Sequence, residues 1–241
     1  MTGTDFFQAA PGVRMGALSH LQALHFATHD SFAEGQNGPT HQPVEVDSLY
    51  RAMPNLTYFR PCDAEETVAA WRYGLESTTR PTMISLGRDP VGPVTGTSRT
   101  QALKGAYVIK EDANAAVTLA SCGTCLHRVV DAASRLEQAG IIARIVSCPS
   151  LDIFETQSDE YKESVFPTNG RPIISVEEYV ATVWARYVTA SISMTSYGYS
   201  ASSQSNYERF GMDAASITKT VSGYLDGLQG KNARMVGWKQ L

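Results

Sequence analysis

Short apolar runs alternate with helix-period segments along this chain. Runs rich in β-branched and aromatic residues, bounded by Gly, Pro or Asn, predict strands, and segments with apolar residues at helical spacing predict helices. The predicted strands are Ala23–Thr28, Leu56–Arg60, Pro81–Leu86, Val117–Ser121, Ile141–Ser147 and Ile173–Val176. The predicted helices are Pro11–His20, Val44–Met53, Asp63–Leu75, Leu126–Ala139, Tyr179–Ala190 and Asp213–Leu228. This alternation predicts an α/β protein with mainly parallel sheets covered by helices.

The chain divides at a segment of different composition. Residues 89–101 are rich in Pro, Gly, Ser and Thr and include almost nothing bulky, which is typical of a linker. We therefore predict two domains, residues 1–88 and residues 104–241, joined by a linker at residues 89–103. With 241 residues, the chain is long enough to bury a core.

A polar loop, Thr28–Pro43, connects the first of these strands to the next helix. It reads T-H-D-S-F-A-E-G-Q-N-G-P-T-H-Q-P and is long for such a connection. It would open at the carboxyl end of the strand, the usual ligand position in open α/β sheets. His29 and His41 stand in this loop, and imidazoles suit proton transfer to and from sugar oxygens. The alternative is that both are ordinary solvent-exposed loop histidines.

The remaining histidine and cysteine spacings predict no metal site. His25 and His29 would lie about 13 Å apart along a strand, too far to share one ion. Cys122 and Cys125 form a lone C-x-x-C at a strand-to-helix turn, where a helix N-terminus would lower the pKa of a thiol. A redox role is therefore an alternative, but a zinc site would need a second pair of ligands.

Composition excludes several functional classes. The net charge of −4 and the pI of about 5.7, without any basic block, argue against nucleic-acid binding. No apolar run is long enough for a transmembrane helix, and the first residues lack the pattern of a signal peptide. Four widely spaced cysteines fit reduced thiols. We expect a cytoplasmic protein without a membrane partner.

The order of several motifs resembles the transketolase family. The loop is followed by L-Y-R-A-M-P-N-L, F-R-P-C-D-A-E-E-T and P-T-M-I-S-L-G-R-D, and later by R-I-V-S-C-P-S-L-D-I-F and E-Y-K-E-S-V-F-P. Among transketolases, the chain most resembles the dihydroxyacetone synthases of fungi and methylotrophic yeasts. The resemblance covers nearly the whole chain. It implies two α/β domains, an N-terminally truncated pyrimidine-binding domain and a transketolase C-terminal domain, and adds the peroxisome as a second location.

The resemblance implies roles for three loop residues. In transketolases the histidine of T-H-D-S helps to hold the phosphate end of the acceptor, and the histidine of G-P-T-H-Q-P contacts the reacting end of the donor. His29 and His41 would inherit these roles. Asn37 stands where many transketolases have an aspartate that reads the C2 hydroxyl of the sugar. A neutral amide there fits a smaller acceptor such as formaldehyde, and equally a decayed site.

Further site residues follow from the same resemblance. Arg88 matches the arginine of the family's S-R, and its guanidinium is suited to bidentate phosphate binding. The alternative is a surface arginine paired with Asp89. Asp30 of T-H-D-S is a further candidate for substrate binding. Phe6 and Phe7 are the nearest substitutes for the aromatic residues that line the family's cofactor pocket.

The implied cofactor is thiamine diphosphate, shared with a partner chain. The family's G-D-G…N motif for the diphosphate and Mg²⁺ is absent from the sequence, and the glutamate that activates the cofactor would lie upstream of Met1. We therefore expect the partner to hold the Mg²⁺.

The resulting expectation is half of a transketolase-like or dihydroxyacetone synthase-like enzyme. It would transfer a two-carbon ketol unit between sugar phosphates or small aldehydes. Its partner would be a chain carrying the N-terminal half, or it would self-associate. The alternatives are a catalytically silent relative that binds or regulates such an enzyme, an inactive fragment and, last, an independent redox or sugar-binding module.

Overall fold

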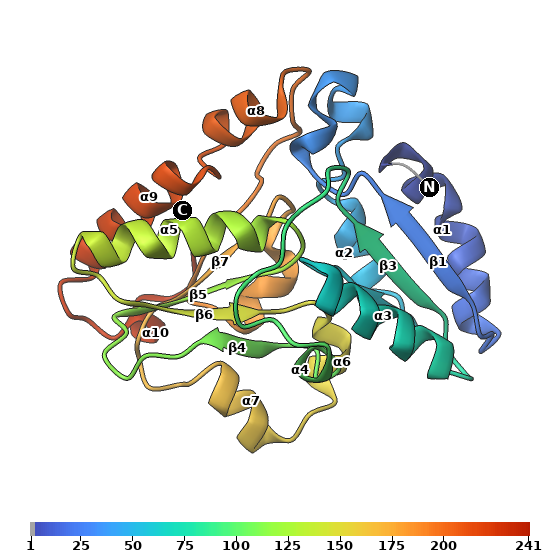
Figure 1. Cartoon of the computed structure of the whole chain (residues 1–241), viewed down its shortest axis with the longest axis horizontal. Helices are drawn as coiled ribbons and strands as arrows, with labels where there is room; N and C mark the ends of the chain where they lie inside the picture. Colours follow the sequence, from blue (N-terminus) through green and yellow to red (C-terminus); the bar gives the residue numbers. More distant parts are fainter. Residues whose placement is uncertain (1–2) are drawn as a thin grey trace.

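Two β-sheets, each covered by helices, form the chain (Figure 1). The computed structural model describes residues 3–241, with side chains described from Gln8 onward. The first sheet is parallel, in the order β1-β3-β2, and consists of β1 (Leu24–Thr28), β2 (Thr57–Phe59) and β3 (Thr82–Leu86). The helices around it are α1 (Gly3–Leu18), α2 (Val46–Arg51) and α3 (Ala64–Glu76).

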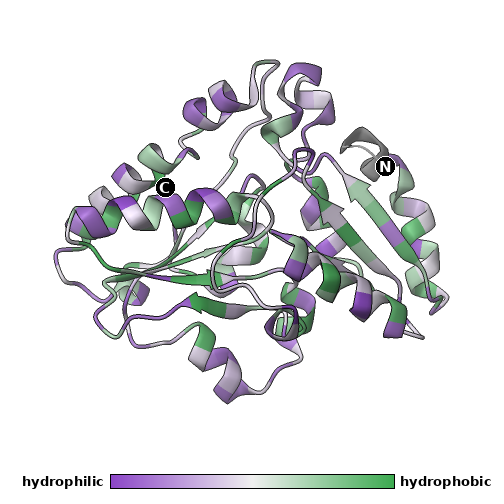
Figure 2. Ribbon diagram, viewed as in Figure 1, coloured by the Kyte–Doolittle hydropathy of each residue, from purple (hydrophilic) through white to green (hydrophobic). Residues whose placement is uncertain are grey.

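Each face of the first sheet has its own apolar core. Successive side chains of a strand point to opposite faces, so Met83 and Ile84 of β3 belong to different clusters. Met83 packs with α1 and α2, and Ile84 packs with α3. Figure 2 shows the apolar residues concentrated along the strands and on the helices beside them.

The second sheet has six strands in the order β4-β6-β5-β7-β8-β9. β4 runs antiparallel to β6, and the other pairs are parallel. The strands are β4 (Tyr107–Lys110), β5 (Val117–Ser121), β6 (Ala143–Ser147), β7 (Ile173–Val176), β8 (Ala190–Ile192) and β9 (Lys239–Gln240). One face packs against α5 (Cys125–Gln138) and α9 (Ala214–Leu228). The other packs against α6 (Leu151–Glu155), α7 (Asp159–Val165) and the 3₁₀ helix η3 (Ala181–Arg186).

The predicted fold class is confirmed, and so is each predicted strand, with shifts only at the ends. The predicted helix Tyr179–Ala190 is wrong, because this segment holds η3 and then β8. Its aromatic side chains are directed by distant partners: the Tyr179 hydroxyl donates to the Asp30 carbonyl at 2.6 Å, and the Trp184 indole donates to Glu177 Oε2 at 2.6 Å.

The segment between the sheets is held against α3. Asp63, the N-cap of α3, accepts a hydrogen bond from the Glu66 amide at 3.2 Å, as its capping pattern predicts. Its second oxygen accepts from the Val94 amide at 3.1 Å and the Thr97 hydroxyl at 2.6 Å. The predicted linker also contains a short helix, α4 (Arg99–Ala102). The division at residues 89–103 stays a prediction.

A buried inter-domain ion network joins the two sheets. Arg60, fully buried after β2, contacts Asp30 through Nε at 2.8 Å. It also contacts Glu177 at 3.0 Å and Glu178 at 2.8 Å, both directly after β7. Arg51 of α2 contacts the other oxygen of Glu177 at 3.0 Å. The first domain thus contributes the cations that two buried carboxylates of the second require.

Within residues 3–241, no helix is long and apolar enough to cross a bilayer.

Candidate functional site

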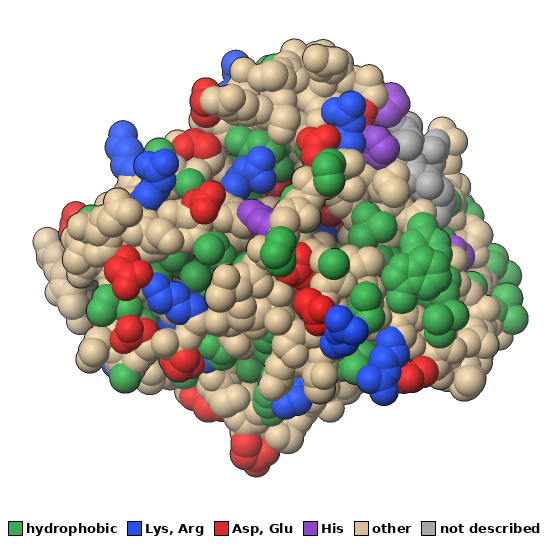
Figure 3. Space-filling model, viewed as in Figure 1, with side chains coloured by type: hydrophobic (Ala, Val, Ile, Leu, Met, Phe, Trp, Pro, Cys, Tyr) green, Lys and Arg blue, Asp and Glu red, His purple; other side chains and the backbone are tan. Residues whose placement is uncertain are grey.

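The strand register of the first sheet brings two predicted site residues together. β1 and β3 are parallel, and Thr28 pairs with Leu86 at their carboxyl ends. His29 follows directly after β1, and Arg88 lies two residues beyond β3. Their side chains therefore emerge at the same edge of the sheet. Figure 3 shows histidine, basic and acidic side chains gathered at the upper right, above the ends of β1 and β3.

Glu34 connects three of the predicted residues. His29 Nε2 lies 3.3 Å from Glu34 Oε2, and Arg88 Nε lies 3.4 Å from the same oxygen. The Asn37 amide donates to Glu34 Oε1. Arg88 therefore pairs with Glu34, and also donates to the Ala33 carbonyl at 3.2 Å. We call these four residues, His29, Glu34, Asn37 and Arg88, the Glu34 cluster.

The loop that carries the cluster is built from two short 3₁₀ helices, η1 (Phe32–Asn37) and η2 (Pro39–His41). Ser31 caps η1 by accepting from the Ala33 amide at 3.3 Å. Gly38 separates the two helices at φ 79°, in the region that favours glycine.

A segment of the second domain holds the loop in place. The Gly35 carbonyl accepts from the Ala201 amide at 3.1 Å, and the Gln36 carbonyl accepts from the Ser200 hydroxyl at 2.9 Å. The backbones approach so closely that a Cβ at Gly35 would lie 2.2 Å from the Ala201 carbonyl oxygen. The loop therefore depends on both domains for its position.

His41 lies apart from the Glu34 cluster. It ends η2, which packs against α1, and its Nδ1 is 3.0 Å from the Thr40 hydroxyl. No contact among the described residues joins it to Glu34. The predicted cofactor contacts of Phe6 and Phe7 concern side chains outside the described part.

Asp30 lies inside the molecule, and its expected role in substrate binding stays a prediction. Its side chain is fully buried and pairs with Arg60. Burial raises the pKa of Asp30, and the charge of Arg60 opposes this shift. Its carbonyl also accepts from the Tyr179 hydroxyl. Asp30 thus fastens the start of the loop to the second domain.

The C-x-x-C pair is enclosed. All four cysteines are buried and unpaired. Burial raises the pKa of Cys122, whose thiol donates to Glu177 Oε1 at 2.9 Å, and it also raises the pKa of Cys125. These thiols stay protonated and out of reach, which speaks against the redox alternative.

The expected cofactor would bring a Mg²⁺ ion, and Mg²⁺ is bound through carboxylate and phosphate oxygens. Among the described residues, no group of three or more His, Cys, Asp or Glu side chains could hold a metal ion.

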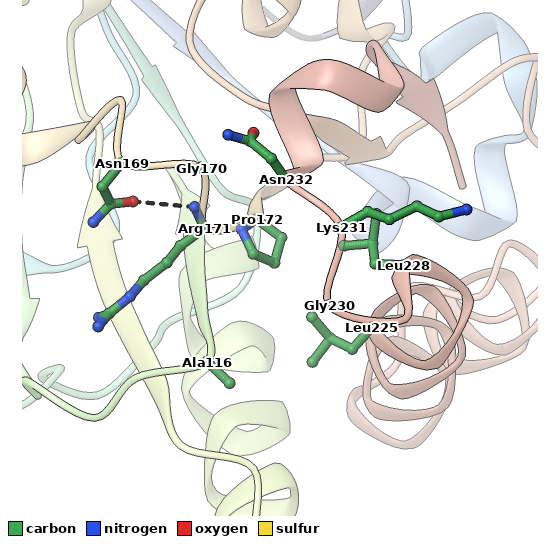
Figure 4. Close-up of a pocket in the computed structure, with 10 residues that line it drawn as sticks. All are labelled: Ala116, Asn169, Gly170, Arg171, Pro172, Leu225, Leu228, Gly230, Lys231 and Asn232. Atoms are coloured by element: carbon green, nitrogen blue, oxygen red, sulfur yellow. Dashed lines mark hydrogen bonds between the residues drawn. The ribbon is translucent and has the colours of Figure 1, made fainter.

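A separate hollow of about 390 Å³ lies at the opposite, amino end of the second sheet (Figure 4). Two of its polar side chains already bind within the chain: Asn169 accepts from the Arg171 amide at 3.1 Å, and Arg171 donates to the Ala113 carbonyl at 3.2 Å. Asn232 caps α10 (Ala233–Val236). The hollow lies at the end of the sheet opposite to the one where ligands usually bind in α/β folds.

Sequence reasoning named His29, Asn37 and Arg88 as candidates, which stay predictions, and did not name Glu34. The available signal was an acidic residue in a polar, glycine-containing loop between two candidate histidines. The contacts of Glu34 depend on the direction in which η1 points its side chain, and residue spacing does not predict that direction.

Comparison with known proteins agrees with this architecture. Residues 2–93 match the transketolase pyrimidine-binding domain, and residues 105–213 match the transketolase-like C-terminal domain. Dihydroxyacetone synthase of Candida boidinii is 38% identical over 221 residues, which cover 91% of this chain and 31% of that protein. A probable transketolase of Schizosaccharomyces pombe is 37% identical over 223 residues, 90% of this chain and 32% of that protein.

Solved structures give the same result. A transketolase from Pichia stipitis in complex with sedoheptulose-7-phosphate superposes with a TM-score of 0.92 at 34% identity, covering 96% of this chain and 34% of that one. An inactive β4 tetramer of a split-gene transketolase gives a TM-score of 0.71 at 25% identity, covering 92% of this chain and 74% of that one. The chain spans about a third of the length of its curated relatives. It is a member of the transketolase family that carries the pyrimidine-binding and C-terminal domains.

Proposed function

We propose that this chain is one half of a transketolase-type enzyme that transfers a two-carbon ketol unit between sugar phosphates or small aldehydes. The observation that carries the proposal is the arrangement of His29, Asn37 and Arg88 at the carboxyl ends of β1 and β3, in a chain of this family. Sugar-transferring sites need such neutral and cationic donors around a carbonyl and its hydroxyl groups.

The loop residues and Arg88 have different roles in the proposed site. His41 binds the reacting end of the donor and exchanges protons with its hydroxyl and carbonyl oxygens. His29, Asn37 and Arg88 bind the far end of the acceptor. Thiamine diphosphate, the cofactor of the family, would supply carbanion stabilisation when bound. Phe6 and Phe7 would contact its ring.

A partner chain supplies the diphosphate and Mg²⁺ site. The split-gene transketolase supports this requirement, because a chain of comparable extent is a separate gene product there and its tetramer is described as inactive. The partner is a protein with the N-terminal transketolase half.

A catalytically silent relative that binds a transketolase through the same surface is the second candidate function. Two features favour this silent role. Asn37 replaces a charged hydrogen-bond acceptor, and Glu34 already contacts His29, Asn37 and Arg88.

Calorimetric titration of thiamine diphosphate and Mg²⁺ tests the proposal. The chain is titrated alone, and then together with a protein that carries the N-terminal half. Saturable binding and ketol transfer are expected in the mixture and in neither protein alone. The matched variants are His41→Ala, which should abolish transfer, and His127→Ala, whose ring lies outside the loop, which should not. Complex formation without cofactor binding would support the silent relative, and absence of both would overturn the proposal.

A further inference from the structure

The Glu34 cluster has the geometry of an oxyanion site that is already filled. Two side chains that carry or can carry positive charge, His29 and Arg88, approach a single oxygen, Glu34 Oε2, at 3.3 and 3.4 Å. Both are ion-pair distances, and Glu34 Oε2 has no hydrogen-bond partner among the described residues. Cationic side chains that converge in this way attract external carboxylates and phosphates. Here the anion is a side chain of the same loop.

The carboxylate is fixed in this position. The Glu34 side chain is 6% exposed, whereas those of His29 and Arg88 are 29% and 50% exposed. Its second oxygen accepts from the Asn37 amide. The next residue, Gly35, is bound to the Ala201 amide and has no room to shift toward it. The two cationic side chains are therefore open to solvent on their outer sides, while the carboxylate between them is enclosed.

We propose that Glu34 determines specificity by occupying the anion position between His29 and Arg88, so that the site takes small unphosphorylated aldehydes or hydroxyketones and rejects phosphate-bearing ones. The substrate class rests on the proposed function, but the exclusion of phosphate does not.

Like-charge repulsion explains the rejection. A phosphate group that approached Arg88 would come close to the Glu34 carboxylate, or would have to displace it from three contacts at once. Two anions in one small site disfavour each other strongly. An uncharged carbonyl compound meets no such penalty and can accept hydrogen bonds from the exposed sides of His29 and Arg88.

Phosphate binding by the full chain tests the proposal without any need for activity. Inorganic phosphate is titrated while the imidazole NMR signals of His29 are followed, first in the parent chain and then in Glu34→Gln. The amide keeps the size of the side chain but removes its charge. We expect no saturable binding to the parent chain at millimolar phosphate. We expect a gain in affinity of about tenfold or more in the variant, since removing one adjacent like charge is worth about one pKa unit or more.

Two controls define the site. The double variant Glu34→Gln/Arg88→Ala should lose the gain, because its main cation is absent. Glu65→Gln removes an exposed carboxylate of α3 that pairs with Arg99 of α4, and phosphate binding should not change. Circular dichroism shows whether each variant is folded, and Glu34→Ala replaces Glu34→Gln if the latter is not.

Equal phosphate affinity in the parent chain and in Glu34→Gln would overturn the proposal, and so would a gain that persists without Arg88. Failure of ketol transfer in the two-chain mixture would refute the proposed function alone, since the phosphate titration does not depend on it. If transfer occurs, Glu34→Gln should raise kcat/KM for phosphorylated acceptors relative to glycolaldehyde.

Discussion

Charge at single buried residues decides how the two domains hold together. Arg51 and Arg60 form ion pairs with four carboxylates in the interior of the chain. The carboxylates are Asp30, Asp47, Glu177 and Glu178. Although burial favours its neutral form, Arg51 and Arg60 hold the pKa of Glu177 at about 2. Asp47 is different, because burial outweighs its contact with Arg51 and raises its pKa to about 7.

Removing Arg60 should be severely destabilising. Arg60→Met leaves three buried carboxylates without their shared cation, and we expect the free energy of unfolding to fall by about 3–5 kcal/mol. Urea denaturation followed by circular dichroism measures this. Arg72→Ala removes an exposed arginine paired with Glu76 and should change stability by at most about 0.5 kcal/mol. A similar loss in both variants would show that the burial of Arg60 is not the cause.

Asp47 should make stability fall as pH rises. Its pKa is about 7 in the folded chain and near its ordinary value of 3.8 in the unfolded chain. Between these values the folded chain binds the extra proton, so the contribution of Asp47 is present at low pH and is lost as pH rises through about 7.

Urea midpoints at pH 5, 6, 7 and 8 check this contribution. Asp47→Asn should have a smaller decrease between pH 5 and 8 than the parent chain. The control is Asp159→Asn, at a carboxylate that is 94% exposed. An unchanged slope in Asp47→Asn would contradict the raised pKa.

At the scale of elements, the sequence was informative wherever periodicity and local capping decide the structure. The helices α3, α5 and α9 and all six predicted strands lie where their patterns predict. Segments directed by distant partners could not be predicted. η3 is the main example, because Tyr179 and Trp184 bind Asp30 and Glu177. β8 and β9 span only a few residues each, too few for a periodic pattern.

The candidate site divides in the same way. Motif matches named His29 and Arg88 as separate candidates, and the parallel register of β1 and β3 brings them near each other. Asp30 is the neighbour of His29 in the same loop, yet it points into the interior toward Arg60. Nothing in a polar loop sequence distinguishes the residue that faces solvent from the one that faces the core. The direction of Glu34 was hidden for the same reason.

The contact between η1 and the 199–203 segment can be tested at a glycine. In Gly35→Ala the new methyl group would meet the Ala201 carbonyl oxygen, so we expect a loss of about 1–3 kcal/mol and weaker amide protection in the loop. Gly223→Ala lies inside α9 with nothing within 4 Å of the new methyl group, and should stabilise the chain by up to about 1 kcal/mol. Urea denaturation and hydrogen exchange measure both. Unchanged protection in Gly35→Ala would show that the loop does not depend on this contact.

At the scale of the whole molecule, apolar side chains remain uncovered on the first domain. Figure 3 shows a broad hydrophobic area over α3, where Val68, Trp71 and Leu75 are exposed. Around α1 and α2, Met15, Leu18 and Leu49 are also exposed, beside a hollow of about 510 Å³. Uncovered apolar surface of this kind is typical of association sites.

We expect the isolated chain to self-associate through the α1 surface. Sedimentation velocity should show a concentration-dependent oligomer. Leu18→Arg, which places a charge on a side chain that is 62% exposed, should shift the distribution toward the monomer. Arg72→Ala, on an exposed and already polar position of α3, should leave it unchanged. A parent chain that stays monomeric at high concentration would contradict the expectation.

The enclosure of all four cysteines makes the chain suitable for thiol labelling. A maleimide reacts with accessible thiolates, and every native thiol is buried, so the folded chain should remain unlabelled. A cysteine introduced at exposed Gln204, next to the 199–203 segment that contacts η1, would then carry a single fluorophore. The native thiols, in turn, would become reactive on opening of the core. The rate of labelling of the native cysteines would thus measure how often the folded chain opens.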